Sequence, residues 1–483
     1  MTETMLQYKT PETVSIAYQQ SLIQQGGSYI KLLRPATIGG GIYRFDEQRR
    51  DALIRRFNDA ANRLDMIKFV PASGAATRMF KRIYMWIADA ETHKEDIEAF
   101  FTKVEAFAFF EEWVTAADQA DLETFEAGLQ SKVSWLKLLV DPSYLGLAQR
   151  PKGLIPFHQY GEIVHTPVVE HLKEGMAYAA QHKLARITFT VSPEHEEGFK
   201  EEVQHWIQQE PFKQVKWDIA FTHQDPSTDT IALDEAGKVV EAEDGKPLRR
   251  PGGHGALIHN LNDLDADMVF IKNIDNVAHD RLLATTAAHK KVIAGLLLEF
   301  RADLKSLHAD LHKGLVDEQL INDLRDKWGL RIPRDYKKLK AYINRPIRVC
   351  GMVKNEGEPG GGPFWTIDQH TGESLQIVEK AQIDPADSRQ QRIAEGATHF
   401  NPVDLVCYLK NMDEDPIDLL DYVNGEQYFT VEKTQEGRVI KGLEWPGLWN
   451  GTMAHWITLF VEVPMETFNP VKELQDLFRE NHR

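Results

Sequence analysis

The sequence predicts an α/β protein built on a mainly parallel central sheet. Short apolar runs typical of strands alternate with longer stretches in which apolar residues recur at helical spacing. This alternation favours parallel strands that are covered by helices on both faces. The chain has 483 residues, 42% of them hydrophobic and 27% charged, so it can bury a large core without disulfides.

Apolar periodicity and chain breakers define the expected elements in order. The expected helices are 45–65, 194–209 and 281–313, with a block of helices at 82–150 that carries aromatic residues at helical spacing. The expected strands are 66–70, 184–192, 215–221, 268–271, 427–431 and 456–463, the last two as later additions to the same sheet. This order predicts a helical N-terminal segment, 1–65, followed by one large domain, 66–483, into which the block 82–150 is inserted.

Charge and composition exclude several classes of protein. The net charge of −17 argues against nucleic acid as the main partner, because a phosphate backbone requires a basic surface. No apolar run approaches the roughly 18 residues of a membrane span, and the N-terminus does not resemble a secretory signal. With only Cys350 and Cys407, the chain has no disulfide framework. We therefore expect a cytoplasmic protein without a membrane partner.

The first motif with chemical meaning follows the strand 66–70. Its residues are small from Ala72 to Ala76, and a helical pattern then begins with Thr77 and Arg78. Small residues allow backbone N–H groups to approach phosphate oxygens, and the arginine can neutralise them. The candidate ligand contacts in this loop are Ser73, Gly74, Ala75, Thr77 and Arg78. An ordinary strand-to-helix turn is the alternative interpretation.

The second motif combines a glycine-rich loop with a carboxylate that follows a strand. Residues 251–255 read Pro-Gly-Gly-His-Gly, and Asp275 comes shortly after the apolar strand 268–271. Ligands of open α/β sheets bind beyond the carboxyl ends of strands, and Mg²⁺ prefers oxygen ligands. Asp275 is therefore the expected metal ligand. A tight turn for the glycines and a strand-end cap for the aspartate are the alternatives.

Six segments in this order resemble the UDP-sugar pyrophosphorylases, a family that includes UTP–glucose-1-phosphate uridylyltransferases and UDP-N-acetylhexosamine pyrophosphorylases. The segments are Ala72–Met79, Pro251–Gly255, Asn273–Asn276, Leu375–Ile383, Phe400–Leu405 and Phe468–Lys472. They are similar to that family's glycine-rich Thr-Arg loop, Gly-His-Gly, Asn-x-Asp-Asn, Leu-Leu-Glu-x-x-Gln, Phe-Asn-x-x-x-Leu and Phe-x-Pro-x-Lys segments. As a whole, the sequence resembles an uncharacterised bacterial family of the DUF4301 type that is related to these enzymes.

The resemblance implies a GT-A-like nucleotidyltransferase fold and a Mg²⁺-dependent reaction. A sugar 1-phosphate would attack the α-phosphorus of a nucleoside triphosphate, UTP by default, and release pyrophosphate. By match of motif, Arg78 would bind the triphosphate, Lys152 of the Pro-Lys pair would bridge phosphates, and Lys472 would reach the sugar phosphate. The implied contacts to nucleotide or sugar are Gly253, His254, Gly255, Asn273, Glu379 and Asn401, with Asp275 on the metal.

The sequence also departs from the family pattern. Ser73 and Ala76 stand where the family has glycine, Ala256 replaces an acidic residue, and the block 82–150 replaces a short connection. These departures favour, as an alternative, a catalytically altered protein that binds nucleotide sugars. A GT-A glycosyltransferase is a further alternative, but its Asp-x-Asp motif at 265–267 precedes a strand instead of following one. The acidic run 413–415 is interpreted as a solvated loop.

Overall fold

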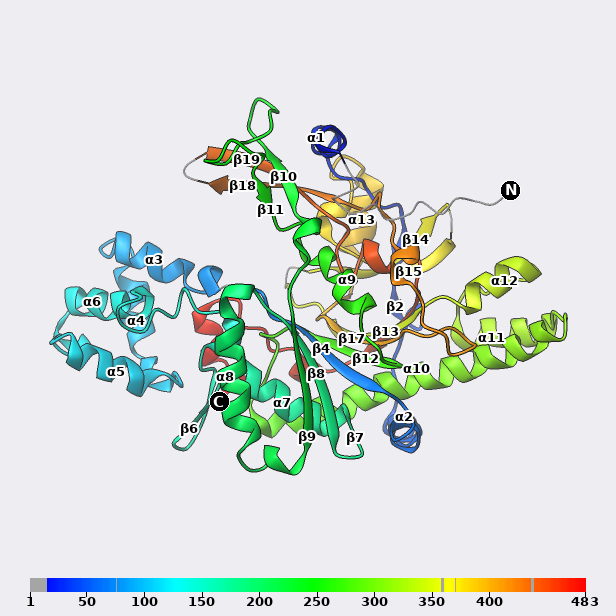
Figure 1. Ribbon diagram of the computed structural model, residues 1–483, viewed down its shortest axis with the longest axis horizontal. Coiled ribbons are helices and arrows are strands. Elements are labelled where there is room, and N and C mark those ends of the chain that lie inside the picture. Colours follow the sequence, from blue (N-terminus) through cyan, green and yellow to red (C-terminus); the bar gives the residue numbers. More distant parts are fainter. Residues whose placement is uncertain (1–14, 75, 358–359, 370, 436–437) are drawn as a thin grey trace. The chain divides into compact units, whose positions relative to one another are not determined.

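The computed structural model describes residues 15–74, 76–357, 360–369, 371–435 and 438–483, which form two compact units (Figure 1). Unit 1 consists of residues 1–67, 224–271 and 290–464, and unit 2 consists of residues 68–223, 272–289 and 465–483. Each unit is therefore assembled from stretches that lie far apart in the sequence. The strands β4 (Met66–Pro71) and β12 (Met268–Lys272) begin in unit 1 and end in unit 2.

The main sheet of unit 1 is mixed. Its central strand, β13 (Ile347–Lys354), pairs in parallel with β20 (Ile457–Glu462) and antiparallel with β17 (Asp404–Tyr408). The short strand β3 (Gly41–Tyr43) continues the sheet in parallel beyond β20, and β2 (Thr37–Ile38) lies beyond β3. The α/β class and the late strand at 456–463 are confirmed, whereas strands run in both directions across this sheet.

Two smaller sheets complete unit 1, and one of them corrects the sequence prediction. The three-stranded sheet has the order β1 (Leu32–Pro35), β14 (Gly362–Asp368), β15 (Gly372–Val378). The four-stranded sheet has the order β11 (Arg249–Arg250), β10 (Thr230–Leu233), β19 (Arg438–Glu444), β18 (Phe429–Gln435). The strand expected at 427–431 exists as β18, but it belongs to this separate sheet because its partner is the neighbouring hairpin strand β19.

The helices of unit 1 include the two that the sequence predicted most clearly. The amphipathic pattern at 45–65 forms α2 (Glu47–Ala61), which begins at an Asp46 cap. The pattern at 281–313 forms the long helix α10 (Leu283–His312), which belongs to unit 2 as far as His289 and to unit 1 from Lys290 on. The remaining helices are α1 (Ile16–Gln25), α9 (Leu257–Asn262), α11 (Glu318–Trp328), α12 (Tyr336–Ile343) and α13 (Ser388–Glu395). The N-terminal segment, expected to be helical, also contains β1, β2 and β3 between α1 and α2.

Unit 2 contains parallel strands as the sequence predicted. β8 (Leu184–Thr190) pairs in parallel with both β4 and β9 (Lys216–Thr222), and the short β7 (Ala180–Gln181) pairs antiparallel with it. Helices α7 (Pro167–Tyr178) and α8 (Glu196–Ile207) pack against these strands. A hairpin of β5 (His158–Tyr160) and β6 (Ile163–His165) precedes α7.

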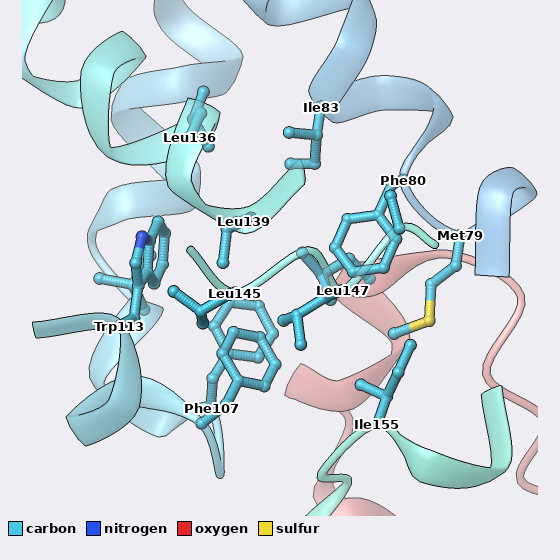
Figure 2. Close-up of a cluster of buried hydrophobic side chains, with 14 of the residues drawn as sticks. Met79, Phe80, Ile83, Phe107, Trp113, Leu136, Leu139, Leu145, Leu147 and Ile155 are labelled. Atoms are coloured by element: carbon cyan, nitrogen blue, oxygen red, sulfur yellow. The ribbon is translucent and has the colours of Figure 1, made fainter. Parts of the chain in front are cut away.

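A helical group within unit 2 corresponds to the predicted block 82–150 (Figure 1). Its members are α3 (Lys81–Ala88), α4 (Lys94–Phe101), α5 (Phe110–Gln119) and α6 (Leu129–Val140). Figure 2 shows their shared aromatic core, in which Trp113 is fully buried and its Nε1 donates to the carbonyl of Trp135 at 2.9 Å. Burying a side chain as large as phenylalanine contributes about 1.5–3 kcal/mol. The aromatic core therefore stabilises the packing of the chain segments that contribute side chains to it.

Two further features concern the described helices and the two cysteines. Among the described helices, none combines the length and the apolar character that a bilayer crossing requires. Cys350 and Cys407 are free thiols buried on the paired strands β13 and β17. Burial raises the pKa of the Cys350 thiol to about 12, so it stays protonated and unreactive.

Candidate functional site

The loop after β4 brings two distant segments of unit 2 together. The main-chain N–H of Lys152 donates to the carbonyl of Gly74 at 3.4 Å, and that of Ala76 donates to the carbonyl of Arg150 at 3.3 Å. Gly74 is exposed and has open space on its Cβ side, whereas Ser73 is partly buried. Ala75 lies outside the described residues. The predicted loop and the Pro-Lys pair are therefore neighbours, although the helical group separates them in sequence.

Beyond this loop, a short 3₁₀ turn over Ala76–Arg78 sets the direction of the side chains. The methyl group of Ala76 is buried in the aromatic core, while Thr77 and Arg78 are exposed. Within the described part of the chain, the guanidinium of Arg78 has no hydrogen bond or ion pair. Its positive charge is therefore available to an anionic ligand.

Asp275 is held beside the same loop by its own backbone. The N–H of Ile274 donates to the carbonyl of Pro71 at 3.2 Å, and the N–H of Asn276 donates to the carbonyl of Asn273 at 3.1 Å. Ile274 and Val277 are buried, which leaves the Asp275 side chain 18% exposed. The carboxylate thus points out of a fixed turn whose apolar neighbours anchor it.

Lys152 connects Asp275 with the C-terminal segment. Its Nζ donates to Asp275 Oδ2 at 2.7 Å and to the carbonyl of Val471 at 2.7 Å. Lys472, the next residue, is exposed, and its ammonium group has no partner within the described part of the chain. Four of the segments singled out in the sequence therefore meet in unit 2: the loop 72–78, Lys152, Asp275 and residues 471–472.

The aromatic core explains how these segments are held. Besides residues of the helices α3–α6, the core includes one residue within or near each of the four segments of the candidate site. These residues are Ala76, Ile155, Val277 and Val471. Figure 2 shows Ile155, Met79 and Phe80 packed together in this core. The inserted helices are thus part of the support of the candidate site, a role that the sequence pattern did not reveal.

A buried charge network lies beneath the loop, and sequence reasoning missed it. Glu174 on α7 accepts from Lys68 at 2.8 Å, from Lys272 at 2.5 Å and from the hydroxyl of Tyr178 at 2.7 Å. Burial alone would raise the pKa of Glu174, but the two ammonium groups hold that pKa well below its ordinary value. The signal in the sequence was a lysine inside each of the apolar strands β4 and β12.

The same network reaches the turn that carries Asp275. His171 is buried beside Lys68, whose Nζ donates to the His171 carbonyl at 3.1 Å. Burial, aided by the charge of Lys68, lowers the pKa of His171 well below its ordinary value, so its imidazole is neutral. Its Nε2 lies 3.2 Å from the carbonyl of Ile274 and donates to it. His171 is therefore a positioning residue for the Asp275 turn.

In unit 1, close packing accounts for the glycines of the Pro-Gly-Gly-His-Gly loop. A Cβ atom on Gly255 would lie 1.9 Å from the carbonyl oxygen of Pro446, and one on Gly252 would lie 2.4 Å from that of Thr228. Gly253 has φ +84°, a conformation that favours glycine. Glycine is thus required at these positions for steric reasons, whatever ligand the loop binds.

His254 is oriented by three contacts within unit 1. Its Nδ1 accepts from the N–H of Leu448 at 2.9 Å, and its ring stacks on Trp449 with centroids 4.8 Å apart. Nε2 lies 3.9 Å from Glu379 Oε1. Because Nδ1 is an acceptor, the neutral imidazole carries its proton on Nε2. Burial lowers the pKa of His254, and the carboxylates of Glu379 and Glu444 partly oppose that shift.

The side chains of Glu379 and Asn401 differ in how far they are exposed to solvent. Glu379 is 33% exposed, and its Oε1 accepts from Asn450 Nδ2 at 2.7 Å. Asn401 is buried, and its Oδ1 accepts from the N–H of Val403 at 3.0 Å, so that oxygen shapes its own turn. The main-chain N–H of Asn401 donates to the carbonyl of Gly361 at 2.8 Å.

The Asp-x-Asp segment has a structural role. Asp267 Oδ1 pairs with Lys410 at 2.7 Å, and Asp267 Oδ2 accepts from the N–H of Asp65 at 2.9 Å. The two carboxylate oxygens therefore link the residues that precede β4 and β12 to the residues that follow β17. This use of the carboxylate argues against a metal-binding Asp-x-Asp motif.

The chain belongs to the DUF4301 family, described as a domain of unknown function, whose model matches residues 2–483. The family membership predicted from the sequence is thereby confirmed. No curated protein matches the sequence.

Solved structures similar to the chain include UDP-sugar pyrophosphorylases at low identity. A uridine diphosphate N-acetylglucosamine pyrophosphorylase from Trypanosoma brucei has 13% identity and a TM-score of 0.48, with 92% of this chain and 72% of that chain covered. A UDP-glucose phosphorylase from Trypanosoma brucei has 13% identity and a TM-score of 0.44, with 97% and 76% covered. The UDP-glucose pyrophosphorylase from Leishmania major has 12% identity and a TM-score of 0.42, with 95% and 73% covered.

Proposed function

We propose that this protein is a Mg²⁺-dependent nucleotidyltransferase of GT-A-like fold. It would form a nucleotide sugar and pyrophosphate from a nucleoside triphosphate, UTP by default, and a sugar 1-phosphate. The observation that carries the proposal is the meeting, in unit 2, of the loop 72–78, Lys152, Asp275 and residues 471–472. The Lys152–Asp275 contact of 2.7 Å joins two of these segments directly.

The charges of this group suit a phosphate-rich ligand. The loop follows the carboxyl end of β4, beside the parallel strand β8, which is where ligands of such sheets bind. Within the described residues, Arg78 and Lys472 expose positive charges that have no partner, and Lys152, which is paired with Asp275, adds a third positive charge. Phosphoryl and nucleotidyl transfer depend mainly on positioning and on neutralising charge. In this proposal, the three cations bind and align the phosphates of both substrates.

Among the described residues, Asp275 offers one free carboxylate oxygen, which suits a Mg²⁺ ion that is also bound to the phosphates of a substrate. Asp275 Oδ2 is bound to Lys152, whereas Oδ1 accepts no hydrogen bond from any described residue. Mg²⁺ takes one or two carboxylate oxygens from a protein and completes its shell with phosphates and water. Asp275 Oδ1 would hold the ion. When bound, Mg²⁺ supplies neutralisation of negative charge on the phosphates.

The residues of unit 1 would bind the nucleotide or the sugar. The neutral His254 presents an N–H at Nε2, and Glu379 presents carboxylate oxygens, so the pair offers one donor and one acceptor to hydroxyl or amide groups. Both side chains are about one-third exposed, at 35% and 33%, and a ligand can reach them. Trp449 fixes the plane of the imidazole by stacking.

The test is pyrophosphate release by the purified chain with Mg²⁺, the common nucleoside triphosphates and a panel of sugar 1-phosphates. Asp275→Asn and Lys152→Ala should each reduce turnover by about 100-fold or more. Asp280→Asn is a matched control, because Lys173 and Asp280 form a similar ion pair of 2.6 Å elsewhere in unit 2. The proposal fails if no combination of substrates releases pyrophosphate.

A second candidate function is binding of a nucleotide sugar without turnover. It is favoured by the buried methyl group of Ala76 where the related loop has glycine, and by the engagement of Lys152 with Asp275 and the carbonyl of Val471. Calorimetry that showed tight nucleotide-sugar binding, no turnover and no effect of Asp275→Ala would select this function. Release of a nucleoside diphosphate instead of pyrophosphate would point to a glycosyltransferase.

A further inference from the structure

Two histidines and one aspartate of unit 1 converge near the C-terminal end of α10. His308 and His312 are four residues apart and share a face of the helix, and Asp413 comes from the loop after β17. We propose that these three side chains bind a divalent transition-metal ion of the Zn²⁺ class. None of them belongs to the residues proposed above for nucleotidyl transfer.

The spacing of the three ligand atoms carries the proposal. The two Nε2 atoms lie 3.1 Å apart, and Asp413 Oδ1 lies 3.3 Å from His308 Nε2 and 3.4 Å from His312 Nε2. Zinc binds imidazole nitrogen and carboxylate oxygen at about 2.0–2.2 Å in tetrahedral geometry, which places its ligand atoms about 3.3–3.5 Å from one another. One ion can therefore lie at bonding distance from all three atoms with little movement of the side chains.

The aspartate is held in place by a clamp on the same helix face. The Nη2 of Arg301 donates to Glu414 Oε2 at 2.8 Å and to the carbonyl of Asn411 at 2.7 Å, and Lys305 also pairs with Glu414. Asn411 Oδ1 in turn accepts from the N–H of Asp413 at 2.9 Å. The loop is thus fixed against α10, which limits the entropy that metal binding would cost.

The ligand set also defines which ions would bind. Imidazole nitrogens suit Zn²⁺, Co²⁺, Ni²⁺ and Cu²⁺, whereas Mg²⁺ prefers a shell of oxygen atoms. The side chains of His312 and Asp413 are 64% and 50% exposed, so an ion can enter from solvent. Three protein ligands leave a fourth position for water. A bound ion would fasten the last turns of α10 to the loop 409–416.

The first experiment measures Zn²⁺ binding to the full chain by calorimetry after removal of metals with a chelator. His312→Ala and Asp413→Asn should each weaken Zn²⁺ binding by at least about tenfold. Two matched controls should leave the affinity unchanged: His205→Ala, an exposed helix histidine followed one turn later by Gln209, and Asp415→Asn in the same loop as Asp413. Equal Zn²⁺ affinity in the wild type and in both ligand variants would overturn the proposal.

The second experiment uses Co²⁺ as a spectroscopic probe and heat as a structural one. Bound Co²⁺ should give the visible absorption of a low-coordinate site, which Zn²⁺ should remove and excess Mg²⁺ should not. Saturating Zn²⁺ should raise the Tm of the wild type and leave that of His312→Ala unchanged, because only the native site binds the ion. Removal of the cobalt spectrum by Mg²⁺, or equal Tm shifts in both proteins, would contradict the inference.

Discussion

The two groups of candidate ligand residues are held by different forces. In unit 2, the segments around Lys152 and Asp275 pack on the aromatic core and also lie beside buried charges, with Glu174 between two lysines. In unit 1, His254 is held by shape, because the glycines beside it leave no space for a Cβ atom. The comparison teaches that a change of charge should damage the first group, whereas a change of volume should damage the second.

The largest effect should follow from removing the buried charge of unit 2. Glu174→Gln would leave Lys68 and Lys272 without their shared carboxylate in a buried environment. Breaking such a pair costs about 3–5 kcal/mol, so the free energy of unfolding should fall by about that amount in a urea titration. Glu210→Gln, which removes an exposed carboxylate paired with Lys213, is the control and should leave the protein as stable as before. If Glu174→Gln lowered the free energy of unfolding only slightly, the buried charges would not be what stabilises the segments around Lys152 and Asp275.

The next largest effect should come from adding a methyl group in unit 1. Gly255→Ala would bring a Cβ atom to 1.9 Å from the carbonyl oxygen of Pro446, and backbone must move to relieve that contact. Overpacking of this kind costs about 1–3 kcal/mol, measured by the same urea titration. Gly425→Ala is the matched control, because a Cβ atom there meets nothing within 4 Å. Equal stability of the two variants would remove the steric argument for the loop.

A smaller effect should measure how strongly Lys152 and Asp275 depend on each other. The single variants Lys152→Met and Asp275→Asn and the double variant form a cycle that isolates their contact of 2.7 Å. Because both side chains are mostly buried, at 14% and 18% exposure, the coupling should be about 0.5–3 kcal/mol. The same cycle on the more exposed Lys173–Asp280 pair should give a lower value. A coupling near zero would mean that the pair does not order the site.

The smallest effect should be the response of His254 to acid. Burial lowers its pKa in the folded chain, so the unfolded chain binds a proton first, near the ordinary histidine value of about 6.5. Its contribution to stability is therefore complete above about pH 6.5 and declines as the pH falls below that value. His254→Gln should lose less stability than the wild type between pH 7 and pH 5, as unfolding at each pH would show. A steeper loss in the variant would contradict the assigned direction.

Much of the fold could be predicted because its signals are local. The helices α2, α8 and α10 and the strands β4, β8, β9 and β12 each carry the periodicity or the apolar run that the structure confirms. The central strand β13 was not predicted, since Arg348 and Gly351 interrupt its apolar run. Arg348 is tolerated there because Thr458, Gln376 and the carbonyl of Trp449 accept its hydrogen bonds, and such partners are not visible in local sequence.

By itself, the sequence predicted which residues carry chemistry: the small-residue loop after β4, the Pro-Lys pair, the Gly-His-Gly loop and the aspartate after β12. It also contained two histidines one helical turn apart on α10 and an acidic run that was interpreted only as a solvated loop. The tertiary structure decided which of these meet. Lys152 reaches Asp275, Glu174 reaches two strands, and Asp413 reaches α10, because packing brings together residues that are far apart in the chain.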